Sequence, residues 1–178
     1  METNVTPVST TTIGLRYGLL SALTAVIVDF LIRIAEFSFI KFGIVSFLGG
    51  TIITIVWIVL AHRAFKETSN RLMSFSQGLV IALIMVLMIS IVSGLFNYVY
   101  VHFIDPDFVD RLKSGMTDFM ERNNVPDDKI AESTTRFDDM NLNLPKTMFN
   151  SITRGLGIGL ILGAIVTAFT KRSASEFE

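Results

Sequence analysis

The stretch from Phe75 to Phe103, FSQGLVIALIMVLMISIVSGLFNYVYVHF, contains no Asp, Glu, Lys or Arg. A helix of this length, rising about 1.5 Å per residue, exceeds the roughly 30 Å hydrocarbon core of a bilayer. A core helix of a soluble protein is the alternative explanation for any single apolar run. The rest of the chain therefore decides between the two.

Three further stretches are apolar and about long enough to span a bilayer, and they run from about Ile13 to Ile34, Gly43 to His62 and Met148 to Thr170. Across the 178 residues, 51% are hydrophobic and 17% are charged, with a mean hydropathy of +0.56. A soluble domain usually carries about a quarter charged residues. Four such helices would leave a soluble fold too little polar surface, so we predict an all-α integral membrane four-helix bundle.

The predicted domain organisation follows from the polar segments between these runs. Residues 1–12 form a polar N-terminal tail, 13–104 hold the first three spans, 105–145 form an acidic extramembrane helical hairpin, 146–170 hold the fourth span, and 171–178 form a tail. The first span resembles a secretory signal in position only. It contains Arg16, Asp29 and Arg33 and is preceded by no basic residue, so we expect a retained anchor.

The orientation is predicted from the basic residues of short loops, which favour the cytoplasmic side. Arg63, Lys66 and Arg71 lie between the second and third spans, and Lys171 and Arg172 follow the fourth. Asp and Glu exceed Lys and Arg in the block 105–145. We therefore expect a multi-pass protein of the bacterial inner membrane with both termini in the cytoplasm and an acidic hairpin outside.

The segment FNYVYVHFIDPDFVDRL, residues 96–112, is predicted to join the third span to the hairpin. Asp105 is expected to cap a helix, Pro106 to take its first position, and Asp107 to complement the helix dipole. The helix then carries an apolar stripe formed by Phe108, Leu112, Met116 and Phe119.

A second hairpin helix is predicted to open at Pro126 and to end at Pro145, with Ile130, Phe137 and Met140 near one face. The apolar stripes of the two helices could pack on each other, on the outer ends of the spans, or on a partner protein. The stripe of the first helix is therefore a possible partner face.

Two groups of residues within the spans are candidate sites. Asp29 and Arg33 are four residues apart, so they can form an ion pair on one helix face. Ionisable residues within a span are functional candidates, and this pair is either a structural intrahelical pair or a site of proton or ion coupling. Gly155, Gly159, Gly163 and Thr167 follow each other at steps of four, which predicts close packing on a helix of this chain or of another copy.

Several classes of site are not indicated by the sequence. The absence of cysteine removes disulfides and thiolate metal sites. His62 and His102 lie at opposite ends of spans, where we expect them to anchor the interface rather than share a metal. The acidic residues after Asp105 lack the glycine and the final glutamate of a calcium loop. No catalytic or phosphate-binding motif occurs, and the net charge of −1 argues against nucleic acid. We expect no catalytic residue, metal or cofactor.

The chain resembles the bacterial family called domain of unknown function 4199. The resemblance covers nearly the whole chain and is carried by the four-span layout, the aromatic junction FNYVYVHFIDPDF, the hairpin insert and the glycine-rich fourth span. It implies an integral membrane protein of unassigned activity and supplies no site residues.

Two functional hypotheses remain at this point. The first is a non-enzymatic scaffold or accessory subunit whose hairpin binds an envelope protein. The second is a small oligomeric transporter or channel that uses Asp29 and the glycine-rich fourth span. The lipid bilayer is a partner in both, and a homo-oligomer is compatible with both.

Overall fold

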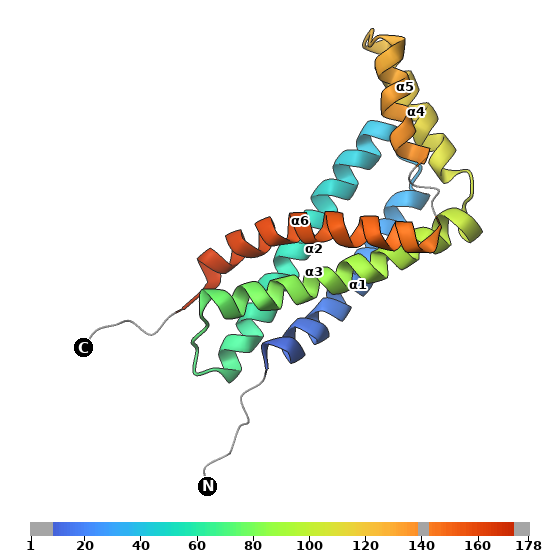
Figure 1. Cartoon of the computed structure of the whole chain (residues 1–178). Helices are drawn as coiled ribbons and strands as arrows, with labels where there is room; N and C mark the ends of the chain where they lie inside the picture. The colour runs from blue at the N-terminus through green and yellow to red at the C-terminus, as the bar shows by residue number, and fades with distance from the viewer. Residues whose placement is uncertain (1–8, 139–142, 173–178) are drawn as a thin grey trace.

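The computed structural model describes residues 9–138 and 143–172, and Met140 of the predicted second hairpin helix lies outside them. In chain order the elements are α1 (Thr10–Ile34), α2 (Phe39–Thr68), α3 (Phe75–Val99), a π-helical turn η1 (Tyr100–Ile104), α4 (Phe108–Arg122), α5 (Asp127–Asp138) and α6 (Leu144–Thr170). Figure 1 shows these helices and their connections. The all-α prediction is confirmed.

Four helices have the length and composition to cross a membrane: α1, α2, α3 together with η1, and α6. Large apolar side chains cover their outer surfaces, and Phe169, Phe149 and Phe47 are 86%, 69% and 66% exposed. Such a surface suits hydrocarbon and not water. The protein is therefore a multi-pass membrane protein, as the composition predicts.

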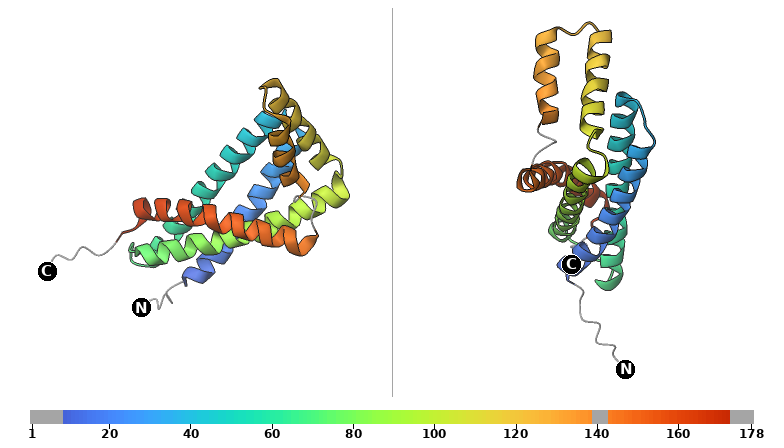
Figure 2. Two further views of the ribbon diagram at one scale, coloured as in Figure 1. Left: turned by 45° about the horizontal axis from the view of Figure 1, so that its top comes forward. Right: turned by 90° about the vertical axis from the view of Figure 1, so that its right-hand side faces the viewer.

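The four spans do not all pack against one another to the same extent. α3 lies beside α6, α1 packs on α3, and α2 packs on α1. α1 begins and α6 ends at one end of the molecule, here called the termini end, and α4 and α5 lie at the other, here called the hairpin end (Figure 1). Figure 2 shows that α2 and α6 approach each other toward the termini end and diverge toward the hairpin end.

The glycine-rich face of α6 packs on α3 within the same chain. A Cβ atom on Gly155 would lie 1.8 Å from the Oγ of Ser90, and one on Gly159 would lie 2.3 Å from Val86. One added to Gly163 would lie 2.9 Å from the Cβ of Ala82. The fully buried Thr167 fills the space beside Gly78. The two helices therefore approach so closely that only glycine fits at these positions.

His62 holds the termini end closed. Its side chain is completely buried, with Nδ1 2.7 Å from the hydroxyl of Thr170 and Nε2 2.9 Å from the carbonyl oxygen of Gly78. Lys66 adds a bond to the carbonyl oxygen of Thr170. The prediction of an interface anchor is wrong for His62, because its ring joins α2 to α3 and α6 in the interior.

The junction between α3 and α4 differs from its prediction in one respect. The helix does break at Asp105, whose backbone is not helical, but α4 begins only at Phe108 with Asp107 at the N-cap position. Asp107 makes no side-chain capping bond, and Pro106 lies in the turn before the helix. The Asp105 carboxylate binds other side chains instead of capping the helix.

The hairpin also ends earlier than predicted. α6 begins at Leu144, and Pro145 lies in its first turn, where no backbone N–H is needed. The side chain of Asn143 caps this helix by accepting a bond from the backbone N–H of Lys146. Pro145 therefore belongs to the fourth span and does not close the hairpin.

Candidate functional site: a polar cavity between the spans

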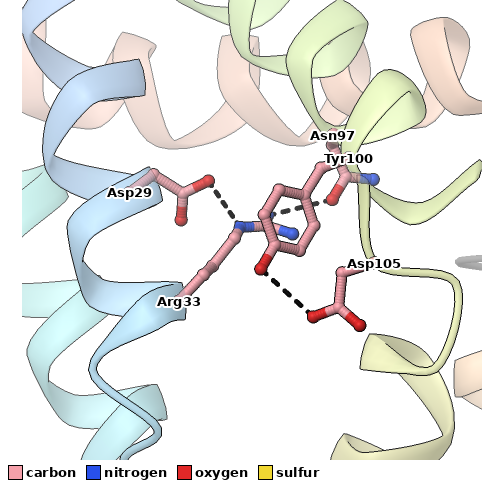
Figure 3. Close-up of polar contacts among 5 residues, drawn as sticks. All are labelled: Asp29, Arg33, Asn97, Tyr100 and Asp105. Carbon is pink, nitrogen blue, oxygen red and sulfur yellow. Dashed lines mark hydrogen bonds and ion pairs between the residues drawn. The ribbon is translucent and has the colours of Figure 1, made fainter. Parts of the chain in front are cut away.

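Asp29 and Arg33 form an ion pair near the hairpin end of α1. The Nε of Arg33 donates to Oδ2 of Asp29 at 2.9 Å, and its Nη2 donates to Oδ1 of Asn97 on α3 at 3.0 Å. Figure 3 shows these contacts. The Arg33 side chain is 8% exposed and that of Asp29 is 32% exposed. The pair thus joins two spans and is not confined to one helix face.

Aromatic rings surround the same guanidinium group. Its central carbon lies 4.5 Å from the ring centre of Phe108, 4.6 Å from that of Tyr100 and 5.6 Å from that of Phe96. Cations are stabilised over aromatic faces, most strongly where water is absent. Nη1 of Arg33 has no hydrogen-bond partner among the described residues. Arg33 therefore connects α1 to α3, η1 and α4 at one point.

Asp105 continues this network toward the hairpin. Its carboxylate accepts two bonds from Arg111, with 3.0 Å between Nη1 and Oδ1, and one bond of 3.2 Å from the hydroxyl of Tyr100. The hydrogen bond from Arg111 is the main reason that the pKa of Asp105 lies below its ordinary value of 3.8. Asp105 thus fastens the first turns of α4 to the end of the third span.

The ion pair between Asp105 and Arg111 predicts that the stability of α4 depends on pH. A carboxyl group with a lowered folded-state pKa stabilises the fold above its ordinary pKa, and this stabilisation is lost as pH falls through the lower folded value. We expect the protection factors of α4 amides, which are exchange rates corrected for the intrinsic effect of pH, to be unchanged between pH 7 and pH 5 and to fall only below about pH 4. Asp105→Asn should lower these protection factors at pH 5 to 7, and the difference from the wild type should shrink as the Asp105 carboxyl group becomes protonated. Asp110→Asn, one turn away and exposed, is the matched control. Equal exchange in the two variants would contradict the role of Asp105.

A cavity of 440 Å³ lies between the four spans beside this ion pair. Its walls come from α1, α2, α3 and α6. The polar lining consists of Asp29, Arg33, Ser46, Thr51, Thr54, Ser93, Asn97 and Ser151. The Oγ of Ser46 is buried and has no hydrogen-bond partner among the described residues. The cavity therefore has an ion pair in its wall, and two of its lining residues, Ser46 and Arg33, each carry a buried polar atom with no partner in the part of the chain that the structure describes.

A second cavity lies on the other side of Arg33. It has a volume of 250 Å³ and is lined by the connection between α1 and α2, the start of α2, and α4. Arg33 and Phe108 line it, together with Arg111. Arg33 is therefore part of the lining of both the space among the spans and the space beneath the hairpin.

The α4 stripe is mostly covered by its own chain. Phe108 is 7% exposed and packs on Tyr100 and on Phe42 of α2. Leu112 and Met116 pack against the same cluster, which also includes Phe137 of α5. Only Phe119, 43% exposed, is left as an open apolar residue of the stripe. Both packing alternatives within the chain are therefore realised, and little of the possible partner face is free.

Sequence reasoning found the ion pair but missed the residues around it. The sequence places Asn97 and Tyr100 only in the segment that joins the third span to the hairpin, although an amide near the end of an apolar span is an available signal. Gly78, Ala82, Ser90 and Gly94 of α3 also step by multiples of four and face α6, and this register was overlooked. The glycine face of α6 does not line the cavity, which is reached instead by Ser151, Ile158 and Leu162.

The family comparison agrees with this architecture. The family described as "Protein of unknown function (DUF4199)" matches residues 13–172, so the chain belongs to that family. No curated protein and no solved structure matches the chain.

Proposed function

We propose that this member of the DUF4199 family is a non-enzymatic carrier that binds a small amphiphilic molecule in the 440 Å³ cavity between its spans. The cavity, with an ion pair and hydroxyl groups inside a membrane-spanning bundle, is the observation that carries the proposal. Polar groups at this depth are costly, and those retained usually line a pathway for a substrate or an ion. This favours the transporter hypothesis over the scaffold hypothesis.

The arrangement of the spans supports movement of a ligand from one side of the membrane to the other. At the termini end, His62 and Lys66 bind Thr170 and close α2 against α6. At the hairpin end the same two helices diverge around the cavity. Small carriers alternate between states that open on opposite sides of a fixed site. Release of the contacts to Thr170 would open the other side.

Gly50 offers a direct test, because it lines the cavity and has nothing within 4 Å of an added Cβ atom. We expect the wild-type protein, extracted with its surrounding lipid, to retain an amphiphilic molecule detectable by native mass spectrometry. Gly50→Trp should lose it, because an indole fills much of the cavity. Gly157→Trp is the matched control, since Gly157 is equally open but does not line the cavity.

The two variants distinguish binding in the cavity from binding on the outer surface. Retention of the molecule by Gly50→Trp would contradict binding in this cavity. Loss from both variants, with unchanged thermal stability, would place the molecule on the outer surface of the bundle. Loss from Gly50→Trp alone would support the proposal.

The scaffold function is the second candidate, and the shape of the hairpin favours it. α4 and α5 extend away from the spans at one end of the molecule, with Phe119 exposed on α4 (Figure 1). Deletion of residues 108–143 should abolish crosslinks to an envelope protein if the hairpin is the interacting part. A carrier should keep its bound amphiphile after the same deletion.

The cellular location is part of the proposal. The basic loop after α2 and the basic residues after α6 lie at the termini end, which supports a bacterial inner membrane protein with cytoplasmic termini. Reporter fusions at Thr68 and Asn124 test this orientation. An active extracytoplasmic reporter at Thr68 would reverse it.

A further inference from the structure

We infer that the molecule bound in the cavity is a zwitterionic phospholipid with an N–H-bearing headgroup, of the phosphoethanolamine type, which enters between α2 and α6 from the leaflet on the hairpin side. This inference rests on the proposed function and specifies its ligand. It is carried by the position of the cavity, by the distribution of its polar groups and by its charge.

The position of the cavity gives access from the bilayer. Phe47 of α2 and Ile158 of α6 both line it and are 66% and 54% exposed on the surface that faces hydrocarbon. Gly50 of α2 also lines the cavity. It is exposed and carries no side chain that could cover the opening. α2 and α6 diverge at this level (Figure 2). A lipid can therefore enter sideways without crossing the polar surface.

The charged part of the lining lies near the hairpin end of the cavity. Arg33 and Asn97 lie near the hairpin end of α1 and α3, and Ser151 lies near the same end of α6. Eight residues deeper, at about 1.5 Å per residue, the lining consists of Ala25 on α1 and Ile89 on α3, with Leu162 on α6, whereas Thr51 and Thr54 on α2 continue the hydroxyl lining. Over about 12 Å the charged groups therefore give way to an uncharged lining that is apolar on three of its four walls, which suits a charged headgroup near the hairpin-side surface and an acyl chain toward the membrane centre.

The charge of the site favours a zwitterion. Asp29 and Arg33 are the charged residues of the described lining, and their formal charges cancel. An uncompensated charge in a low-dielectric interior is costly, so an anionic or a cationic headgroup would bring that cost with it. A headgroup with one charge of each sign adds none.

The unpaired groups favour a headgroup that both donates and accepts. Asp29 gives only Oδ2 to Arg33, and its Oδ1 has no partner among the described residues. An ammonium group can donate to this oxygen, whereas the trimethylated amine of phosphatidylcholine has no hydrogen to donate. Ser46 Oγ and Arg33 Nη1 belong to residues of the same lining and have no hydrogen-bond partner among the described residues, and both atoms are buried. A phosphate would accept from both kinds of donor once the Ser46 and Arg33 side chains turn toward it.

The test uses photolabelling in vesicles made of equal parts of phosphatidylethanolamine, phosphatidylcholine and phosphatidylglycerol. In each experiment one of the three carries a photoreactive acyl tail, and labelled peptides are identified by mass spectrometry. We expect phosphatidylethanolamine to label α3 and α6 peptides around Ile89 and Ile158 about tenfold more than either other lipid, as one charge-assisted hydrogen bond allows. Gly50→Trp should abolish this labelling, and Gly157→Trp should not.

A charge change provides the second measurement. Asp29→Asn leaves Arg33 uncompensated, so labelling should shift toward the anionic phosphatidylglycerol. Glu67→Gln is the matched control, because it removes another carboxylate four residues from an arginine, in an exposed pair outside the cavity. Equal labelling by all three lipids that still depends on Gly50 would overturn the headgroup inference and leave the carrier proposal standing. Labelling that is insensitive to Gly50→Trp would overturn both.

Discussion

Replacement of Gly159 by leucine is expected to lower the free energy of unfolding by about 3 kcal/mol, the upper end of the usual cost of overpacking. A Cβ atom at this position would lie 2.3 Å from one methyl carbon of Val86 and 2.6 Å from the other. The remaining leucine carbons have no free space between α3 and α6. The helices must separate, and the small-residue contacts along them are then lost together. Denaturation of the purified protein by titration with sodium dodecyl sulfate measures the change.

Gly157 is the control for this substitution. It lies two residues away on the same helix, where an added Cβ atom meets nothing within 4 Å. Gly157→Leu should change stability by less than about 1 kcal/mol, as expected for an open surface position. Equal destabilisation by the two substitutions would mean that helix flexibility, and not the contact with α3, explains the glycines.

Arg33→Leu is the second substitution with a large expected effect. It leaves the carboxylate of Asp29 and the amide of Asn97 without their donor in the interior of the bundle. Removal of one partner of a fully buried ion pair costs about 3–5 kcal/mol, since the remaining charge stays desolvated. The Asp29 side chain is 32% exposed, so we expect a loss near the lower end of this range. It also removes the cation from between Tyr100 and Phe108, which loosens α4. The same denaturation assay, combined with amide exchange in α4, measures both effects.

A double substitution distinguishes the buried charge from general loss of packing. Asp29→Leu combined with Arg33→Leu removes both charges, so it should be less destabilising than Arg33→Leu alone. Arg63→Leu breaks an exposed ion pair of the same spacing and should cost at most about 1 kcal/mol. If the double variant were as unstable as Arg33→Leu, the ring contacts of Arg33 would outweigh its ion pair.

The spans could be predicted from composition because each is a long run whose hydropathy is set by its own residues. The break at Asp105 could also be predicted, since proline and carboxylates interrupt a helix locally. The start of α4 could not, because the Asp105 carboxylate binds Tyr100, five residues before it, and Arg111, six residues after it. A choice between capping and pairing depends on contacts that a local pattern does not contain.

The cavity could be predicted only in part. The Asp29–Arg33 spacing indicates an ion pair, but the position of Asn97 opposite it depends on how α1 packs on α3. The space itself results from the divergence of α2 and α6, which no single helix encodes. The partner of the α6 glycines could be predicted only in part, because small residues of α3 step by four from Gly78 to Gly94 but Val86, which lies against Gly159, is not small.

The central claim is that the space between α2 and α6 holds an amphiphilic molecule. A cryo-electron microscopy map of the protein in lipid nanodiscs tests it most directly. A bound antibody fragment would enlarge the particle enough for alignment. We predict elongated non-protein density in the cavity, with its broad end beside Asp29 and Arg33 and its narrow end passing Ile89 and Leu162. A map in which α2 is packed against α6 along its full length, with no cavity and no such density, would contradict the account.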